Sequence, residues 1–304
     1  RHISTLLSDP REELRSIGRA LLEEGKKITP GLLSHVAVNE YTISREEYVN
    51  NFQSKLNLSL PTAKPGRQDD AVKLVSLSSQ IEAKIAAAIL YEHCISGQSY
   101  EYYLQLCIGD KEMVNKIFQL YLDERGKFDQ LPIAAEVGHL LFEVVMDFGA
   151  YRDLQRHRRN LFLRAPLTSL LGIEYPEFVQ EPELAMVKEM IDLCAQKTLG
   201  LYQKVKVKVP LAAEYITMFA HKQRVLWQMD PRQLAYVVEL RSKPTGHHSY
   251  RDICQRMFEL VEEQLPLLAN YIRVDKSRED SRKEQEEKVV KKLEALGGDV
   301  NKII

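Results

Sequence analysis

The sequence predicts an α+β fold that is mostly helical and has a small sheet. Long stretches repeat apolar residues at the spacing of one helix face, and 8–27, 182–204 and 250–264 are examples. Two runs differ from this pattern. Residues 71–77 alternate apolar and polar side chains, and residues 140–147 are rich in Val, Leu and Phe, as strands are. Few strand-like runs among many helical ones give the mostly helical class.

Composition places the chain among ordinary globular proteins. Of its 304 residues 44% are hydrophobic and 28% charged, which excludes collagen-like, fully disordered and disulfide-scaffold classes. With 42 basic and 43 acidic residues the net charge is -1, so no overall attraction to nucleic acid or membranes is expected. No apolar run reaches a membrane-spanning length of about 18 residues. Four scattered cysteines predict buried thiols in a reducing, cytoplasmic setting.

The first part of the chain is predicted to be helical. Residues 8–27 begin at Ser8-Asp9-Pro10 and end at Thr29-Pro30, and a second helix is expected around 45–56. Two prolines and a glycine then predict a linker over 61–70. We therefore expect a helical segment at 1–60, separate from the rest of the chain.

After the linker, the predicted strand at 71–77 leads into a helix with a capping-box spacing at Ser79 and Glu82, which Gly97 ends. Further helices are expected from Asp110 to Gly126, from Pro182 to about Lys204, from Asp230-Pro231 to Leu240, and over 250–264. Residues 275–304 are almost all charged or polar and predict a solvated helix or disordered tail.

An internal similarity suggests a duplication. Residues 13–30 can be laid on residues 249–266 without a gap, matching Arg15 with Arg251, Ile17 with Ile253 and Pro30 with Pro266. Two unrelated amphipathic helices ended by proline would also give this match. If Arg1 is the counterpart of Arg241, residues 1–60 are the tail of a preceding copy and 71–274 a complete copy.

The most unusual cluster runs from Arg152 to Asn160 and includes Arg156-His157-Arg158-Arg159. It directly follows the apolar strand-like run. Arginine forks presented at the end of a strand suit phosphate or pyrophosphate, which they bind in bidentate fashion. A surface charge patch with local carboxylate partners is an equally good interpretation of the spacing.

Other candidate residues give weaker signals. Arg241 ends an apolar helix, where a cation complements the helix dipole. The adjacent His247 and His248 make a poor metal pair, and no metal site, phosphate loop or dinucleotide fingerprint is predicted. His93 and His139 lie in apolar stretches and are expected to be structural, and Trp227 is expected in the core.

At the cluster, the segment from His139 to Arg158 resembles the flavin-dependent thymidylate synthase family, also called the thymidylate synthase complementing protein family. Arg156-His157-Arg158 match the family's Arg-His-Arg triplet. Where the family continues with Ser, Asn, Glu, Ser, Arg and Tyr, this chain departs, and those positions hold Leu161, Leu163, Arg164, Pro166, Thr168 and Ser169.

A second block supports the resemblance. Residues 213–241 can be laid without a gap on the family pattern Ala-Arg-x-x-Leu-Pro, Asn-x-Arg and a helix ending Leu-Arg. Leu240-Arg241 and Arg232 are kept, whereas Glu214 replaces the first arginine, Asp230 the asparagine and Met218 the proline. The resemblance covers roughly residues 71–270.

The resemblance implies an α+β fold with a small antiparallel sheet, assembled as a tetramer or pseudo-tetramer with FAD between subunits. It implies methylation of dUMP to dTMP with methylenetetrahydrofolate, reduced flavin and NADPH. In this implied site Arg156, His157 and Arg158 hold FAD, Arg156 also lies near the nucleotide phosphate, and Arg241 stabilises the uracil ring as N3 loses its proton. No metal, membrane or nucleic-acid partner is implied.

The departures qualify this expectation. A carboxylate at Glu214 would repel a nucleotide phosphate, and Thr168 removes another family arginine. This copy is therefore a candidate for a degenerate partner that shapes the flavin site while another copy supplies the substrate groups. The alternative is a non-catalytic helical scaffold or interaction module with a basic anion-binding patch.

Overall fold

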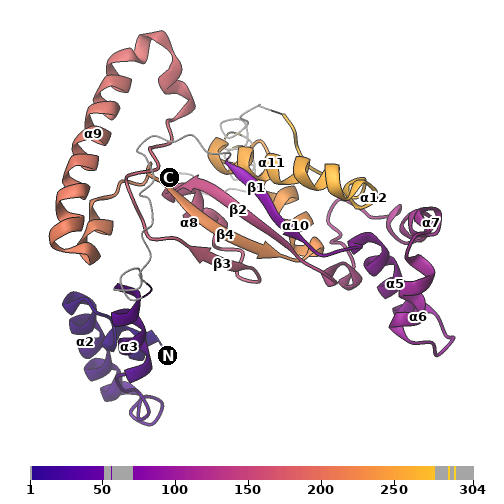
Figure 1. Ribbon diagram of the computed structural model, residues 1–304, viewed down its shortest axis with the longest axis horizontal. Coiled ribbons are helices and arrows are strands. Elements are labelled where there is room, and N and C mark those ends of the chain that lie inside the picture. Colours follow the sequence, from indigo (N-terminus) through magenta and orange to yellow (C-terminus); the bar gives the residue numbers. More distant parts are fainter. Residues whose placement is uncertain (1, 51–55, 57–70, 278–286, 288–290, 292–304) are drawn as a thin grey trace. The chain divides into compact units, whose positions relative to one another are not determined.

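The computed structural model (Figure 1) describes residues 2–50, 56, 71–277, 287 and 291. The predicted linker at 61–70 and most of the predicted tail at 275–304 lie outside the described residues. The chain divides into two compact units, Arg1–Ala63 and Lys64–Ile304.

The first unit is helical and consists of α1 (His2–Leu7), α2 (Glu12–Ile28) and α3 (Glu40–Asn50). The expectation of one helix over 8–27 was wrong at its start, because Pro10 lies in the turn between α1 and α2. The second helix begins earlier than the expected residue 45. Gly18 lets α2 approach α1 closely, since a Cβ at this position would lie 3.0 Å from the backbone nitrogen of Leu7.

The second unit is mostly helical with one small sheet, as predicted. Its first half contains β1 (Val72–Leu77), α5 (Ile81–His93), α6 (Tyr100–Cys107), α7 (Lys111–Leu122), η1 (Ile133–Glu136), β2 (Leu140–Asp147), α8 (Phe148–Leu154) and β3 (Leu161–Arg164). Its second half contains η2 (Glu177–Gln180), η3 (Pro182–Leu184), α9 (Ala185–Lys208), η4 (Pro210–Ile216), β4 (Lys222–Met229), α10 (Pro231–Arg241), α11 (His248–Gln264) and α12 (Pro266–Ala269).

The sheet is antiparallel throughout, in the order β1-β2-β4-β3. Its register places Phe142 of β2, Trp227 of β4 and Phe162 of β3 in one row across the sheet. Trp227 is fully buried, as predicted, and stacks on Phe162 with ring centroids 4.6 Å apart. This aromatic row fixes β3, and hence the turn before it, against the centre of the sheet.

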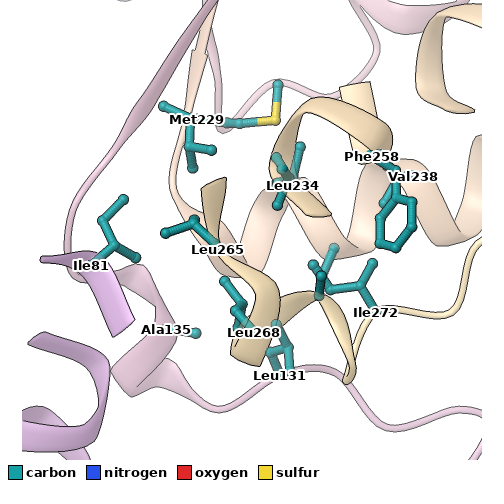
Figure 2. Packing of buried hydrophobic residues seen from close by; sticks show 14 of the residues in the cluster. Ile81, Leu131, Ala135, Met229, Leu234, Val238, Phe258, Leu265, Leu268 and Ile272 are labelled. Atoms are coloured by element: carbon teal, nitrogen blue, oxygen red, sulfur yellow. The ribbon is translucent and has the colours of Figure 1, made fainter. Parts of the chain in front are cut away.

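Helix α11 covers β1 and β2 (Figure 1). Around it the core continues into α10 and α12, where Leu234, Val238, Phe258, Leu268 and Ile272 gather in one apolar cluster (Figure 2). The end of α10 is therefore anchored by buried apolar side chains.

Helix α9 does not join this core and packs instead on η2, η3 and η4, with Tyr202 as its one buried residue. The opposite face of the helix exposes Met186, Met190, Leu193 and Leu201. Cys194 on α9 and Cys94 are exposed as well, so the prediction of four buried thiols was wrong for two of them.

The helix-start signals read from the sequence were only partly correct. The helix expected from Asp110 begins there but ends at Leu122 instead of Gly126, and Asp110 caps it because its Oδ1 accepts the N–H of Met113 at 2.9 Å. The capping box at Ser79 and Glu82 is absent, since Glu82 Oε1 accepts the N–H of Leu268 from α12 at 2.9 Å instead. A contact with α12, and not the local sequence, therefore determines which N–H the Glu82 carboxylate accepts.

Candidate functional site

The basic cluster lies at the end of α8 and in the turn that leads to β3. Asp147 ends β2 and caps α8 by accepting the N–H of Ala150 at 2.8 Å. The expectation that the cluster follows a strand directly was therefore wrong, because the seven-residue α8 intervenes. The turn nevertheless carries the cluster to the sheet edge, where the last residue of α10 also arrives.

The cations of the cluster do not converge on one point. Arg156 and Arg158 are exposed, and the Arg156 guanidinium lies 3.4 Å from Asp153. Arg159 pairs with Glu136 at 2.8 Å. Both interpretations of the cluster thus describe part of it: Arg156 and Arg159 have carboxylate partners, while Arg156 and Arg158 are exposed to solvent.

His157 is the buried member of the triplet and contacts Arg241. The Nε–H of Arg241 donates to His157 Nε2 at 3.0 Å, and a second guanidinium N–H donates to the carbonyl of Asp153 at 3.2 Å. The guanidinium also lies over the ring of Tyr250, 5.5 Å from its centroid. The structure therefore joins two residues that are 84 positions apart in the sequence and belong to the two separate motif blocks.

This contact defines the protonation state of His157. Because an arginine N–H can only donate, Nε2 must be unprotonated and the imidazole must be neutral, with its proton on Nδ1. Burial and the nearby Arg241 cation lower the pKa of His157 to about 4. The imidazole is thus a fixed neutral acceptor that orients Arg241 at neutral pH.

A pocket of about 530 Å³ opens along α10, and its lining includes Tyr236 but neither His157 nor Arg241. Arg232, Tyr236 and Leu240 line it from α10, and Leu131 and Lys243 contribute further walls. The ring of Tyr236 stands edge-on to that of His157, with centroids 5.7 Å apart, which connects the pocket to the His157–Arg241 pair. The volume is in the range of small-molecule and cofactor sites.

Glu136 forms an ion pair with Arg232, which lines this pocket. Its carboxylate accepts Arg232 at 2.7 Å and Arg159 at 2.8 Å, and the two arginines lower its pKa. The Nε of Arg232 is buried and has no hydrogen-bond partner among the residues that the structure describes.

Arg164 and Glu214, two positions at which the charge is opposite to that in the family pattern, lie close together. Glu214 Oε1 accepts the N–H of Leu167 at 2.9 Å, and its other oxygen lies 3.7 Å from Arg164. Since the family pattern has Glu at position 164 and Arg at position 214, acid and base have exchanged places. The exchange keeps an ion pair possible but reverses the charge on η4.

The structure also adds residues that the sequence did not single out. Glu136, Tyr236 and Tyr250 contact the candidate residues, and Tyr236 precedes Arg241 by five positions on α10. The expected structural histidines make hydrogen bonds, His93 with Tyr121 at 2.7 Å and His139 with Ser78 at 3.1 Å. Both are more exposed than the expectation implied. Within the described residues no cluster of His, Cys, Asp and Glu could hold a metal ion.

The unit is α+β, and it brings His157 from the turn after α8 against Arg241 at the end of α10. Exposed arginines beside such a turn are side chains that suit anionic groups. Comparison with known proteins identifies the family of this chain. The chain belongs to the thymidylate synthase complementing protein family, whose sequence profile matches residues 83–267, more than half of the chain.

Curated relatives are longer than this chain. A UPF0159 protein of Chlamydia muridarum is 30% identical over 281 residues, which cover 88% of this chain and 51% of the relative. A UPF0159 protein of Chlamydia pneumoniae is 26% identical over 266 residues, covering 84% of this chain and 48% of the relative. The chain thus spans about half the length of these relatives.

Among solved structures, the UMP/dUMP methylase PolB from Streptomyces cacaoi, crystallised with 5-Br dUMP, matches with a TM-score of 0.52. The match covers 67% of this chain and 95% of PolB at 14% sequence identity. At this identity the likeness establishes the fold, which agrees with the family. Among the described helices, none combines the length and the apolar character needed to cross a membrane.

Proposed function

We propose that this chain forms part of an FAD-dependent thymidylate synthase-like protein that methylates dUMP to dTMP. Methylenetetrahydrofolate would supply the one-carbon unit, and NADPH would reduce the flavin. The observation that carries the proposal is the His157–Arg241 contact, which joins both family motif blocks and is linked through Tyr236 to a pocket of cofactor size. Family membership and the fold shared with a UMP/dUMP methylase support it.

The residues fit an anionic dinucleotide. Arg156 and Arg158 offer exposed guanidinium groups for phosphate oxygens, and the pocket along α10 adds the side chains of Arg232 and Tyr236. We propose that these residues hold FAD. When bound, the flavin supplies hydride to the transferred carbon, which is chemistry that no side chain provides.

Arg241 would face the uracil ring. Its guanidinium is held by His157 and by the Asp153 carbonyl before any ligand arrives, so no reorganisation is needed when N3 loses its proton. His157 is then a positioning residue through Nε2, while its Nδ1–H remains the group that can contact the cofactor. A fixed cation beside a developing anion lowers the barrier to forming that anion.

The phosphate end of the site differs from the family. Glu214 brings a negative charge where the family has an arginine, and Arg164 is already paired with it. Arg156 is the cation left to meet the nucleotide phosphate. We propose that this copy keeps the ring-binding and flavin-binding half of the site, with a weakened phosphate half.

Assembly of several copies is part of the proposal. The family forms oligomers with the cofactor between subunits, and the apolar face of α9 with Met186, Met190 and Leu193 is exposed in the single chain. Burying such a face between copies would be favourable. We propose a homo-oligomer that uses this face, in a cytoplasmic protein without nucleic-acid partners.

Tritium release from 5-labelled dUMP in the presence of FAD, NADPH and methylenetetrahydrofolate tests the function, with flavin absorbance recorded on the same samples. Arg156→Ala should lower both flavin binding and tritium release. Arg256→Ala removes an exposed arginine of α11 that pairs with Glu259 and serves as the matched control. A chain that neither binds FAD nor releases tritium would favour the alternative, an anion-binding interaction module.

A further inference from the structure

Two buried serines occupy the same place in the two units. Ser8 follows the last residue of α1, and Ser242 follows the last residue of α10. Each accepts a backbone N–H from the segment after the next helix: Asn39 donates to Ser8 Oγ at 2.8 Å, and Asp275 donates to Ser242 Oγ at 3.0 Å. The same kind of hydrogen bond therefore joins residues 31 positions apart in the first unit and 33 positions apart in the second.

The helices between these contacts also correspond. α2 and α11 each have 17 residues. Their C-cap residues, Thr29 and Leu265, have nearly the same conformation, φ -134 and ψ 65 against φ -132 and ψ 63, and each directly precedes a proline. Both C-cap residues donate their N–H four residues back, at 2.8 and 2.7 Å. Residues 15–39 therefore correspond to residues 251–275 in register and in the backbone around the helix end, although turns stand at 30–35 where the second unit has α12.

The repeated side chains differ in what covers them. In the second unit α11 rests on β1 and β2, and Met257 and Leu268 are fully buried. Their counterparts in the first unit are Leu21, which is 48% exposed, and Leu32, which is 79% exposed. Ile17, the counterpart of buried Ile253, is also exposed. Within residues 2–50 the structure has no strand on which α2 could rest.

We infer that α1 and α2 are the closing helices of a second family-like unit, and that the apolar face of α2 docks on the antiparallel sheet of that unit. The equivalent face of this chain's own sheet is already covered by α11. A sheet outside residues 71–277 is therefore the occupant. The two Chlamydia relatives, about twice as long as the matched region, have room for such a unit.

The repeat indicates that the second family-like unit and residues 71–277 differ at the position of Arg241. Aligning Ser8 with Ser242, which takes a gap of two residues before α2, places Leu7, and not Arg1, opposite Arg241. The second family-like unit would therefore carry a leucine where this unit carries the guanidinium next to His157. An assembly of the two would have Arg241-bearing sites from one unit only. The docking of α2 is independent of the proposed reaction, because it depends on the fold alone.

A graft within the full chain tests the docking. Residues 242–275 are replaced by a copy of residues 8–39, which puts α2 onto this chain's own sheet. The graft should unfold in one cooperative transition at a lower temperature, because Gly18 and Gly25 replace buried Cys254 and Val261. A second graft with Gly18→Cys and Gly25→Val fills those voids and should recover part of the loss.

The control places Ile17→Glu and Leu21→Glu in the graft, where both side chains would meet the sheet. This graft should lose its cooperative transition. The same two substitutions in the native α2 should leave the unfolding of the original chain nearly unchanged, since both side chains are half exposed there. If both grafts without glutamate fail to unfold cooperatively, or if the glutamates are tolerated in the graft, the inference is overturned.

Amide hydrogen exchange on the original chain gives an independent readout. Amides of α2 should exchange at least about tenfold faster than those of α11, because tertiary cover is what protects a helix of this length. Equal protection in α2 and α11 would contradict the inference. Protection in α2 that rises with protein concentration would assign this face to a second copy of the chain and would contradict it as well.

Discussion

Replacing His157 with glutamine should remove a pH dependence from the stability of the second unit. Glutamine keeps a side-chain acceptor for the Arg241 N–H but cannot titrate. In the wild type the pKa of His157 falls from 6.5 to about 4 on folding, so the unfolded chain binds the proton more tightly. The contribution to stability is fully present above pH 6.5 and is lost as the pH falls towards 4.

The size of this effect follows from the shift. Each pKa unit corresponds to about 1.4 kcal/mol, which gives an upper bound of about 3–4 kcal/mol for the fall from 6.5 to about 4. His157 lies near the rim of a pocket, and solvent screening reduces the value, so we expect about 1–3 kcal/mol. His221 is also buried, and burial lowers its pKa, so it contributes in the same direction to both proteins and cancels in their difference.

Urea unfolding at several pH values between 4 and 7 measures the effect, for the wild type, His157→Gln and the exposed-histidine control His93→Gln. The free energy of unfolding should fall more steeply towards acid in the wild type and in His93→Gln than in His157→Gln. A nuclear magnetic resonance titration of the His157 ring should give a midpoint near 4. Parallel stability curves together with a ring midpoint near 6.5 would refute the buried neutral imidazole.

Three further predictions concern other contacts. Glu214→Arg should lower the melting temperature, because the variant loses the hydrogen bond to the Leu167 N–H and the new arginine repels Arg164. Adding Arg164→Glu should restore about 0.2–1 kcal/mol of the free energy of unfolding in a double-mutant cycle. A coupling energy of zero would argue against the exchanged ion pair. Glu239→Gln should cost about 3–5 kcal/mol in urea unfolding, since it leaves the buried Arg125 cation without its carboxylate at 2.7 Å; a loss below about 1 kcal/mol would show that the pair is well hydrated. Met190→Glu on α9 should shift the species seen by light scattering to a smaller mass, and an unchanged mass would exclude this face from the oligomer interface.

Much of the fold could be predicted because its signals are local. Residues 140–147 form β2 as expected, and Asp230 and Pro231 open α10, where Asp230 accepts the N–H of Gln233 at 2.7 Å. Strand β4 was missed for a physical reason. Its fully buried Gln223 occupies a core position with a polar side chain, which breaks the alternation that identifies a strand.

The site was less accessible to prediction because its contacts are long-range. The resemblance implies that Arg156, His157 and Arg158 hold FAD together, but the turn after α8 directs Arg156 and Arg158 to solvent and His157 into the protein. The partners that decide this are Arg241 and Tyr236, both on α10. No local pattern indicates that a histidine will be a buried acceptor, since its burial is produced by a helix far along the chain.

The two halves of the candidate site differ in how they have changed, and this difference has a physical cause. The ring-facing half depends on the orientation of one guanidinium, and every contact that orients Arg241 comes from within this unit. The phosphate-facing half depends on net charge, which the exchange of acid and base between Arg164 and Glu214 reverses on one element without breaking the fold. Under the proposed function, a unit changed in this way keeps the residues for the flavin and the uracil ring, while the affinity for the nucleotide phosphate has to come from Arg156 or from another polypeptide segment.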